Sequence, residues 1–134
     1  MGPPGMNGPP TPAGLATLLQ VAAGLYGATL LVALARPRLA RWPLLAAVLV
    51  HLAWTTWRGL AIEFFPLTNK AESFSAAALA TGLVTLVAFR ASRAYLVPLL
   101  LVLAAALAAA LAFPQALGWP PPLMRTIWYP THVP

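Results

Sequence analysis

The 134-residue sequence has no cysteine, which excludes disulfide bonds and thiolate metal sites built within this chain. It has only two acidic residues, and charged residues make up 7% of it, whereas a soluble domain has about 25%. So few charges do not cover a water-facing surface, and we expect membrane lipid to surround most of the chain. The net charge of +6 would favour nucleic-acid binding in a soluble protein, but the positions of the arginines explain it without a nucleic-acid partner.

The sequence also lacks the alternating segments of about ten residues that mark a transmembrane β-barrel. Leu and Ala dominate a composition that is 60% hydrophobic. We therefore predict an all-α, polytopic membrane protein. A spanning helix needs about 20 mostly apolar residues, and four segments meet this requirement: 14–35, 42–62, 73–89 and 95–113.

These segments divide the chain into three parts. Residues 13–113 are predicted to form a four-helix transmembrane bundle, preceded by an extended tail over 1–12 that is rich in Pro and Gly. Residues 114–134 are predicted to form an extracytoplasmic segment. The start of the chain lacks the basic region of a cleavable signal peptide, so we expect the first apolar segment to remain as a span.

The arginines predict the orientation of the bundle. Five of the eight basic residues lie in two short connections on the same side, and these are Arg36, Arg38, Arg41, Arg90 and Arg93. Basic residues in short loops are retained on the cytoplasmic side. We therefore expect a multi-pass protein of the inner (plasma) membrane, with both termini and the 63–72 loop on the extracytoplasmic face.

Three side chains on the second span share one helix face, because His51, Trp54 and Arg58 are spaced by three and four residues. The rise from His51 to Arg58 is about 10 Å, close to the distance from a haem iron to its propionates. One hypothesis is a haem held edge-on, with iron bound by His51, propionate bound by Arg58 and Trp54 as a flat wall. The alternative is that His51 is hydrogen-bonded between helices while Arg58 extends towards the membrane interface.

The loop between the second and third spans carries both acidic residues, Glu63 and Glu72. Thr68 is a candidate cap for the third span, and Glu72 in its first turn would interact favourably with the helix dipole. Two carboxylates could also suggest acid/base catalysis, but neither has a partner that would orient it or activate water. We therefore predict no catalytic residue in this chain.

The C-terminal segment contains the other histidine, His132, together with Trp128, a residue type suited to the membrane interface. His132 is either an exposed tail residue or a ligand for a metal or haem iron on the outer surface. The sequence leaves both alternatives open.

Two patches of the chain resemble the CcsA/ResC-type cytochrome c assembly proteins, the haem-handling family of system II. The first patch comprises the second span and the loop after it, with His51, Trp57, Arg58, Pro66, Leu67, Thr68, Asn69, Glu72 and Ser73. The second comprises Leu123, Thr126, Trp128, His132 and Val133. The order and spacing of the patches are similar to those of the family.

The resemblance implies haem transport through the membrane and delivery of haem to apocytochrome c on the outer face. It implies haem b as the cofactor, His132 as an outer ligand of the iron and His51 as a ligand within the membrane. Pro66, Asn69 and Glu72 fall on the positions of the family's loop motif. The chain would then be part of a cytochrome c haem lyase (cytochrome c synthase), although nothing indicates catalysis by this chain alone.

The chain also departs from the family. Ala71 replaces an aromatic residue, Lys70 adds a charge, and the tryptophan-rich external loop, the second external histidine and the later spans are missing. The resemblance therefore covers the N-terminal half of a family member. Either this is part of a longer protein, or a CcsB/ResB-type partner or another chain supplies the tryptophan-rich loop. The alternative function is a non-catalytic structural subunit of a larger respiratory or photosynthetic membrane complex.

Overall fold

The computed structural model describes residues 14–62 and 70–113, which form a bundle of helices. The elements are α1 (Leu15–Ala35), a short 3-10 helix η1 (Pro37–Leu39), α2 (Arg41–Ile62), α3 (Lys70–Val87) and α4 (Arg93–Ala112). The all-α prediction is confirmed for this part of the chain. Each helix overlaps the apolar segment predicted for it. The helix α3 begins at Lys70, before the predicted start at residue 73, so its first turn includes Lys70 and Glu72.

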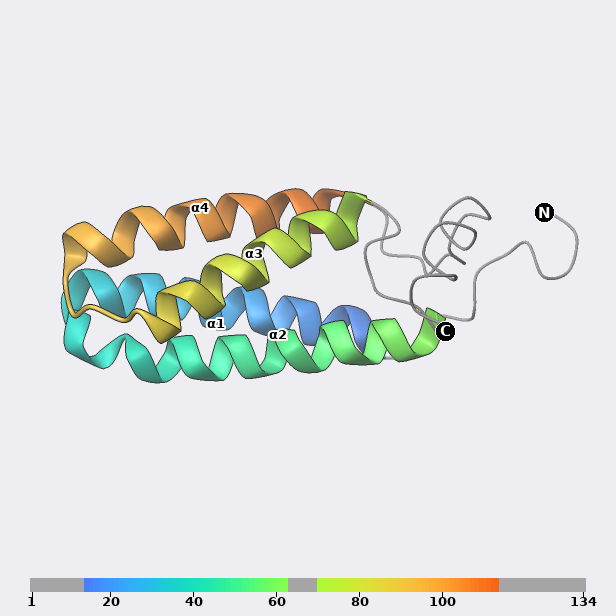
Figure 1. Ribbon diagram of the computed structural model, residues 1–134, viewed down its shortest axis with the longest axis horizontal. Coiled ribbons are helices and arrows are strands. Elements are labelled where there is room, and N and C mark those ends of the chain that lie inside the picture. Colours follow the sequence, from blue (N-terminus) through green and yellow to red (C-terminus); the bar gives the residue numbers. More distant parts are fainter. Residues whose placement is uncertain (1–13, 63–69, 114–134) are drawn as a thin grey trace, which may run out of the picture.

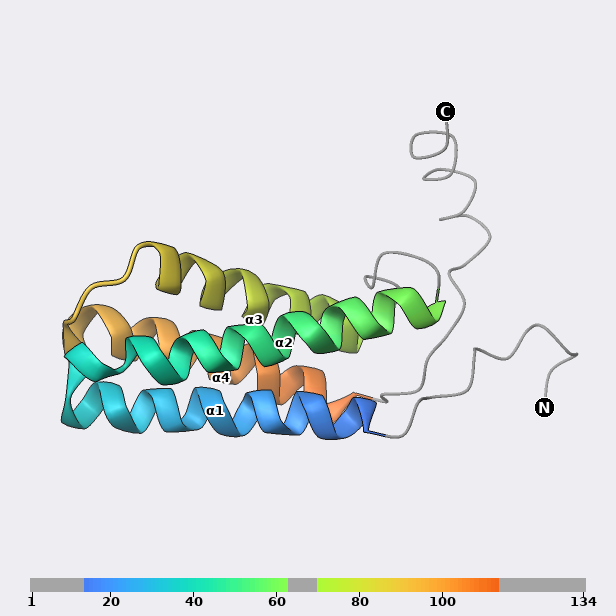
Figure 2. The same cartoon turned by 90° about the horizontal axis from the view of Figure 1, so that it is seen from below.

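The helices run up and down, so that the α1–α2 and α3–α4 connections lie at the same end of the bundle (Figure 1). α1 packs closely along α2, and α3 along α4, while the contact between α2 and α3 is smaller than either of these and smaller than that between α1 and α4. The view from below shows α3 running at an angle to α2 (Figure 2). Among the four pairs of neighbouring α-helices, α2 and α3 therefore pack least closely.

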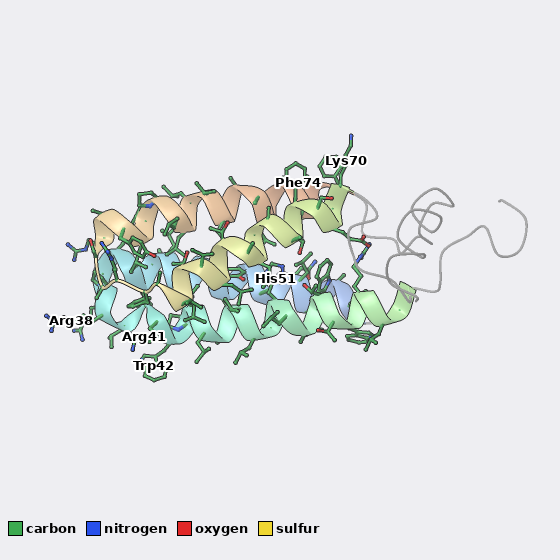
Figure 3. The ribbon with its side chains drawn as sticks, viewed as in Figure 1. Arg38, Arg41, Trp42, His51, Lys70 and Phe74 are labelled. Atoms are coloured by element: carbon green, nitrogen blue, oxygen red, sulfur yellow. The ribbon has the colours of Figure 1, made fainter. Side chains whose placement is uncertain are left out.

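The basic connections lie at one end of the bundle, as the topology requires. Arg38 and Arg41 lie at this end, whereas Lys70 lies at the opposite end (Figure 3). Two contacts tie the connections together: Arg93 Nη2 donates to the Ala35 carbonyl at 3.3 Å, and the Arg41 guanidinium lies 5.0 Å from the centre of the Phe89 ring. The two connections that carry the clustered arginines thus lie at the same end of the bundle.

Three stretches are long and apolar enough to cross a membrane: Leu15–Ala35, Pro37–Ala61 and Arg93–Ala112. The outer surface of the bundle suits lipid, because large apolar side chains such as Leu31, Leu60 and Val87 are exposed. The helix α3, with 18 residues, is not among these stretches.

The bundle core is built from apolar stripes at helical spacing. On α1 the stripe comprises Leu15, Leu19, Ala22, Tyr26, Thr29 and Ala33, and on α4 it comprises Leu96, Leu100, Leu103, Leu107 and Ala110. These stripes face the interior of the bundle. Helix α4 continues through Pro98, which lies in its second turn, so the predicted span is not interrupted.

Gly82 on α3 lies where all four helices meet. A Cβ atom built there would lie 3.1 Å from Tyr26 Oη, 3.3 Å from Val48 Cγ2 and 3.4 Å from Leu103 Cδ1. These three neighbours belong to α1, α2 and α4. The absence of a side chain at Gly82 therefore permits the close approach of α3 to the rest of the bundle.

We predict that Gly82→Ala destabilises the bundle, because the new methyl group would push against Tyr26 and Val48. Overpacking of this kind costs about 1–3 kcal/mol. The matched control is Gly24→Ala, because a Cβ there would meet nothing within 4 Å. Thermal unfolding of both variants in detergent measures the difference. Equal stability of the two variants would contradict the prediction.

Candidate functional site

A cluster of polar side chains lies inside the bundle, in a region that is otherwise apolar. Tyr26 from α1, His51 and Arg58 from α2, and Glu72 and Ser75 from α3 are each 3% exposed or less. Figure 3 shows His51 in the interior. Buried polar groups are stable only when they are hydrogen-bonded or paired, so their partners define what the cluster does.

His51 joins three helices through its ring. Its Nδ1 lies 2.9 Å from Tyr26 Oη on α1, and its Nε2 lies 2.7 Å from Ser75 Oγ on α3. We assign the neutral tautomer in which Tyr26 donates to Nδ1 and Nε2–H donates to Ser75. Each hydroxyl needs an acceptor for its own proton. In this assignment the Tyr26 hydroxyl donates to Nδ1, and the Ser75 hydroxyl, which accepts from Nε2–H, can itself donate to a carbonyl of the preceding helical turn.

Arg58 and Glu72 form an ion pair between α2 and α3. Arg58 Nε donates to Glu72 Oε1 at 2.6 Å, and the two side chains are 1% and 0% exposed. Removing either partner from such a pair leaves an uncompensated charge, which makes the pair a strong constraint on how α2 and α3 meet. Glu72 does lie in the first turn of α3, as predicted, but it also reaches Arg58 on the neighbouring helix.

Trp54 lies between the two polar contacts. It is 2% exposed, its ring centre is 6.1 Å from that of His51, and the Arg58 guanidinium carbon lies 5.3 Å from its ring centre. The structure thus places His51, Trp54 and Arg58 on one buried face of α2, as their spacing predicts. This face is directed towards α3, which supplies both Ser75 and Glu72.

A small groove runs along the α2–α3 seam beside the cluster. Its volume is about 170 Å³, and it is lined by Trp54, Thr55, Glu72, Ser75, Ala76, Leu79, Ala80 and Leu83. Pockets for small molecules generally have about 300–1,000 Å³. The groove is therefore a gap between incompletely packed helices rather than a cavity the size of a cofactor.

The bundle does not fit a haem at His51. Both ring nitrogens are hydrogen-bonded, the Arg58 guanidinium is paired with Glu72, and the adjacent groove is too small for a macrocycle. Of the two hypotheses for His51, this geometry favours a histidine hydrogen-bonded between helices. The accompanying expectation that Arg58 extends towards the membrane interface is wrong, because Arg58 is 1% exposed and paired with Glu72.

Other predicted site residues lie outside the described residues: Pro66, Asn69, Trp128 and His132, together with Glu63 and Thr68 of the loop. Conversely, sequence reasoning missed Tyr26 and Ser75. Tyr26 belongs to the inward stripe of α1, and Ser75 follows Glu72 by one helical turn. The positions of both follow from helical periodicity, whereas their contact with His51 depends on how three helices pack.

Comparisons of the chain with known protein families, with characterised proteins and with solved structures find no match. The contacts within the bundle are therefore the main basis for interpreting the polar cluster.

We predict that Tyr26→Phe lowers the free energy of unfolding by about 1–3 kcal/mol, because it leaves His51 Nδ1 buried without a donor. Chemical unfolding in detergent measures this change. Tyr95→Phe is the control, because the Tyr95 hydroxyl donates to the Ala88 carbonyl at an exposed end of the bundle. We expect the control to change stability by less than about 0.5 kcal/mol. Equal losses in both variants would rule out a special role for the Tyr26–His51 contact.

Proposed function

We propose that this chain is an integral membrane component of cytochrome c biogenesis that handles haem for delivery to apocytochrome c on the extracytoplasmic face. The proposal rests on the two patches of sequence that resemble the CcsA/ResC-type proteins, and the Arg58–Glu72 ion pair connects two residues of the first patch. These two residues were identified at opposite ends of the segment that resembles the CcsA/ResC-type proteins. In the structure these two residues pair, which gives a physical reason for an arginine and a glutamate 14 residues apart in this segment.

In this proposal the bundle is an anchor and a scaffold. His51, Trp54 and Arg58 are engaged inside it. We therefore assign contact with haem b to the C-terminal segment, with His132 as the ligand of the iron and Trp128 beside it. An imidazole is a suitable axial ligand, and an aromatic side chain is a suitable neighbour for the flat macrocycle.

The proposed site needs a second component. The tryptophan-rich loop of the family would come from a CcsB/ResB-type partner or from another chain. The clustering of five arginines at one end of the bundle supports an orientation in which the C-terminal segment lies on the extracytoplasmic face of the plasma membrane. Apocytochrome c is expected on that same face.

A second candidate function is that of a non-catalytic structural subunit of a larger respiratory or photosynthetic complex. The closed interior favours this alternative, because the polar residues of the bundle are used to join helices to one another. Such a subunit would purify in fixed ratio with its complex, and cytochrome c maturation would continue without it.

The proposal predicts that His132→Ala lowers the yield of holocytochrome c by about tenfold or more, as expected for the loss of a ligand. The test uses a bacterial host without its own maturation genes, which expresses this chain, its partner and a cytochrome with a CXXCH motif. Covalently bound haem is measured by peroxidase staining. Thr131→Ala is the neighbouring control and should leave the yield unchanged.

Deletion of the chain in a cell that contains its native partners, with holocytochrome c measured by the same staining, separates the two candidate functions. If deletion of the whole chain leaves holocytochrome c unchanged while a respiratory or photosynthetic complex loses its assembly, the structural alternative is correct. If His132→Ala has no effect while deletion abolishes maturation, the chain acts in biogenesis but His132 is not the haem ligand.

A further inference from the structure

The helix α3 carries two charged residues, Lys70 and Glu72, and its buried polar residues are Glu72, Ser75 and Thr85. It packs between α2 and α4, yet it is not among the stretches apolar enough to cross a bilayer. Its 18 residues extend about 27 Å at 1.5 Å per residue, close to the thickness of the hydrocarbon core. Its first turn includes Lys70 and Glu72, so a crossing by the whole helix would bring both charges to the edge of the hydrocarbon core.

The polar groups of α3 are satisfied in two different ways. Thr81 and Thr85 donate to carbonyls of their own helix, at 2.8 Å and 2.6 Å. Glu72 and Ser75 instead contact α2, through Arg58 and His51. Of these four side chains, only Glu72 and Ser75 make contacts that depend on the presence of another helix.

These two contacts hold a seam that apolar packing holds weakly. Residues 51 and 58 are two turns apart on α2, and residues 72 and 75 are one turn apart on α3, so both helices present their partners on one face. The groove of about 170 Å³ lies along the same seam. At this seam polar side chains therefore hold the two helices together, as packed apolar side chains do elsewhere in the bundle.

We infer that α3 crosses the membrane as a dependent partner of α2, because Arg58 and His51 satisfy the polar groups that α3 carries into the bilayer. The charge of Glu72 is a large penalty for an isolated span and is offset once Arg58 lies beside it. His51 and Arg58, considered above as an iron ligand and a propionate partner, therefore act in placing α3 across the membrane. This inference does not depend on whether the chain handles haem.

The absence of cysteine makes the inference directly testable. A cysteine introduced by Ala91→Cys reports on the α3–α4 connection, and one introduced by Leu39→Cys reports on the α1–α2 connection. Both positions are exposed, and both connections lie at the same end of the bundle. A membrane-impermeant maleimide applied to intact cells and to lysed cells shows the side on which each cysteine lies. In the otherwise unchanged chain we expect both cysteines on the same side.

Arg58→Leu removes the partner of Glu72 and leaves the sequence of α3 unchanged. We expect the Ala91→Cys reporter to move to the opposite side of the membrane in most molecules, while Leu39→Cys stays where it was. Thr56→Leu is the matched control on α2, because Thr56 is exposed, and it should move neither reporter.

The double change Arg58→Leu, Glu72→Leu distinguishes lost pairing from general damage to the fold. It makes α3 more apolar, so α3 should cross without its partner and Ala91→Cys should return to the side of Leu39→Cys. The inference is overturned if Arg58→Leu alone leaves the reporters on one side, or if the double change fails to restore them.

Discussion

The bundle depends on one ion pair placed where water is scarce. Arg58 and Glu72 are almost completely buried, and each is a large penalty in a membrane without the other. Their pairing fixes how the end of α2 meets the beginning of α3. One turn further along α3, the same register brings Ser75 to His51. The position of the third helix follows from this pair together with the close packing of α3 along α4.

The polar cluster shows why side-chain type alone does not define a cofactor site. A histidine, a tryptophan and an arginine on one helix face have the chemistry that a haem requires. In this bundle, however, the imidazole joins Tyr26 on α1 to Ser75 on α3, and the guanidinium is paired with a carboxylate. Their chemistry is used to hold helices together. A role in haem handling is therefore better assigned to residues outside the bundle.

Much of the fold was predictable from the sequence. The spans, their approximate ends and the shared face of His51, Trp54 and Arg58 follow from apolar length and helical spacing. The pairing of Arg58 with Glu72 was not predicted, because periodicity shows which face of a helix is buried and not which neighbour it meets. Tyr26 and Ser75 were missed for the same reason. The partners of the polar residues of α3 became visible only in the packed bundle.

The central claim is that Arg58 and Glu72 stabilise the bundle as a pair. A double-mutant cycle tests it most directly, with unfolding free energies measured in one detergent for Arg58→Leu, Glu72→Leu and the double variant. We predict that each single change costs about 3–5 kcal/mol and that the double change costs much less, because it leaves no unpaired charge. If the two single losses simply add in the double variant, the pair is not the interaction that holds α2 and α3 together.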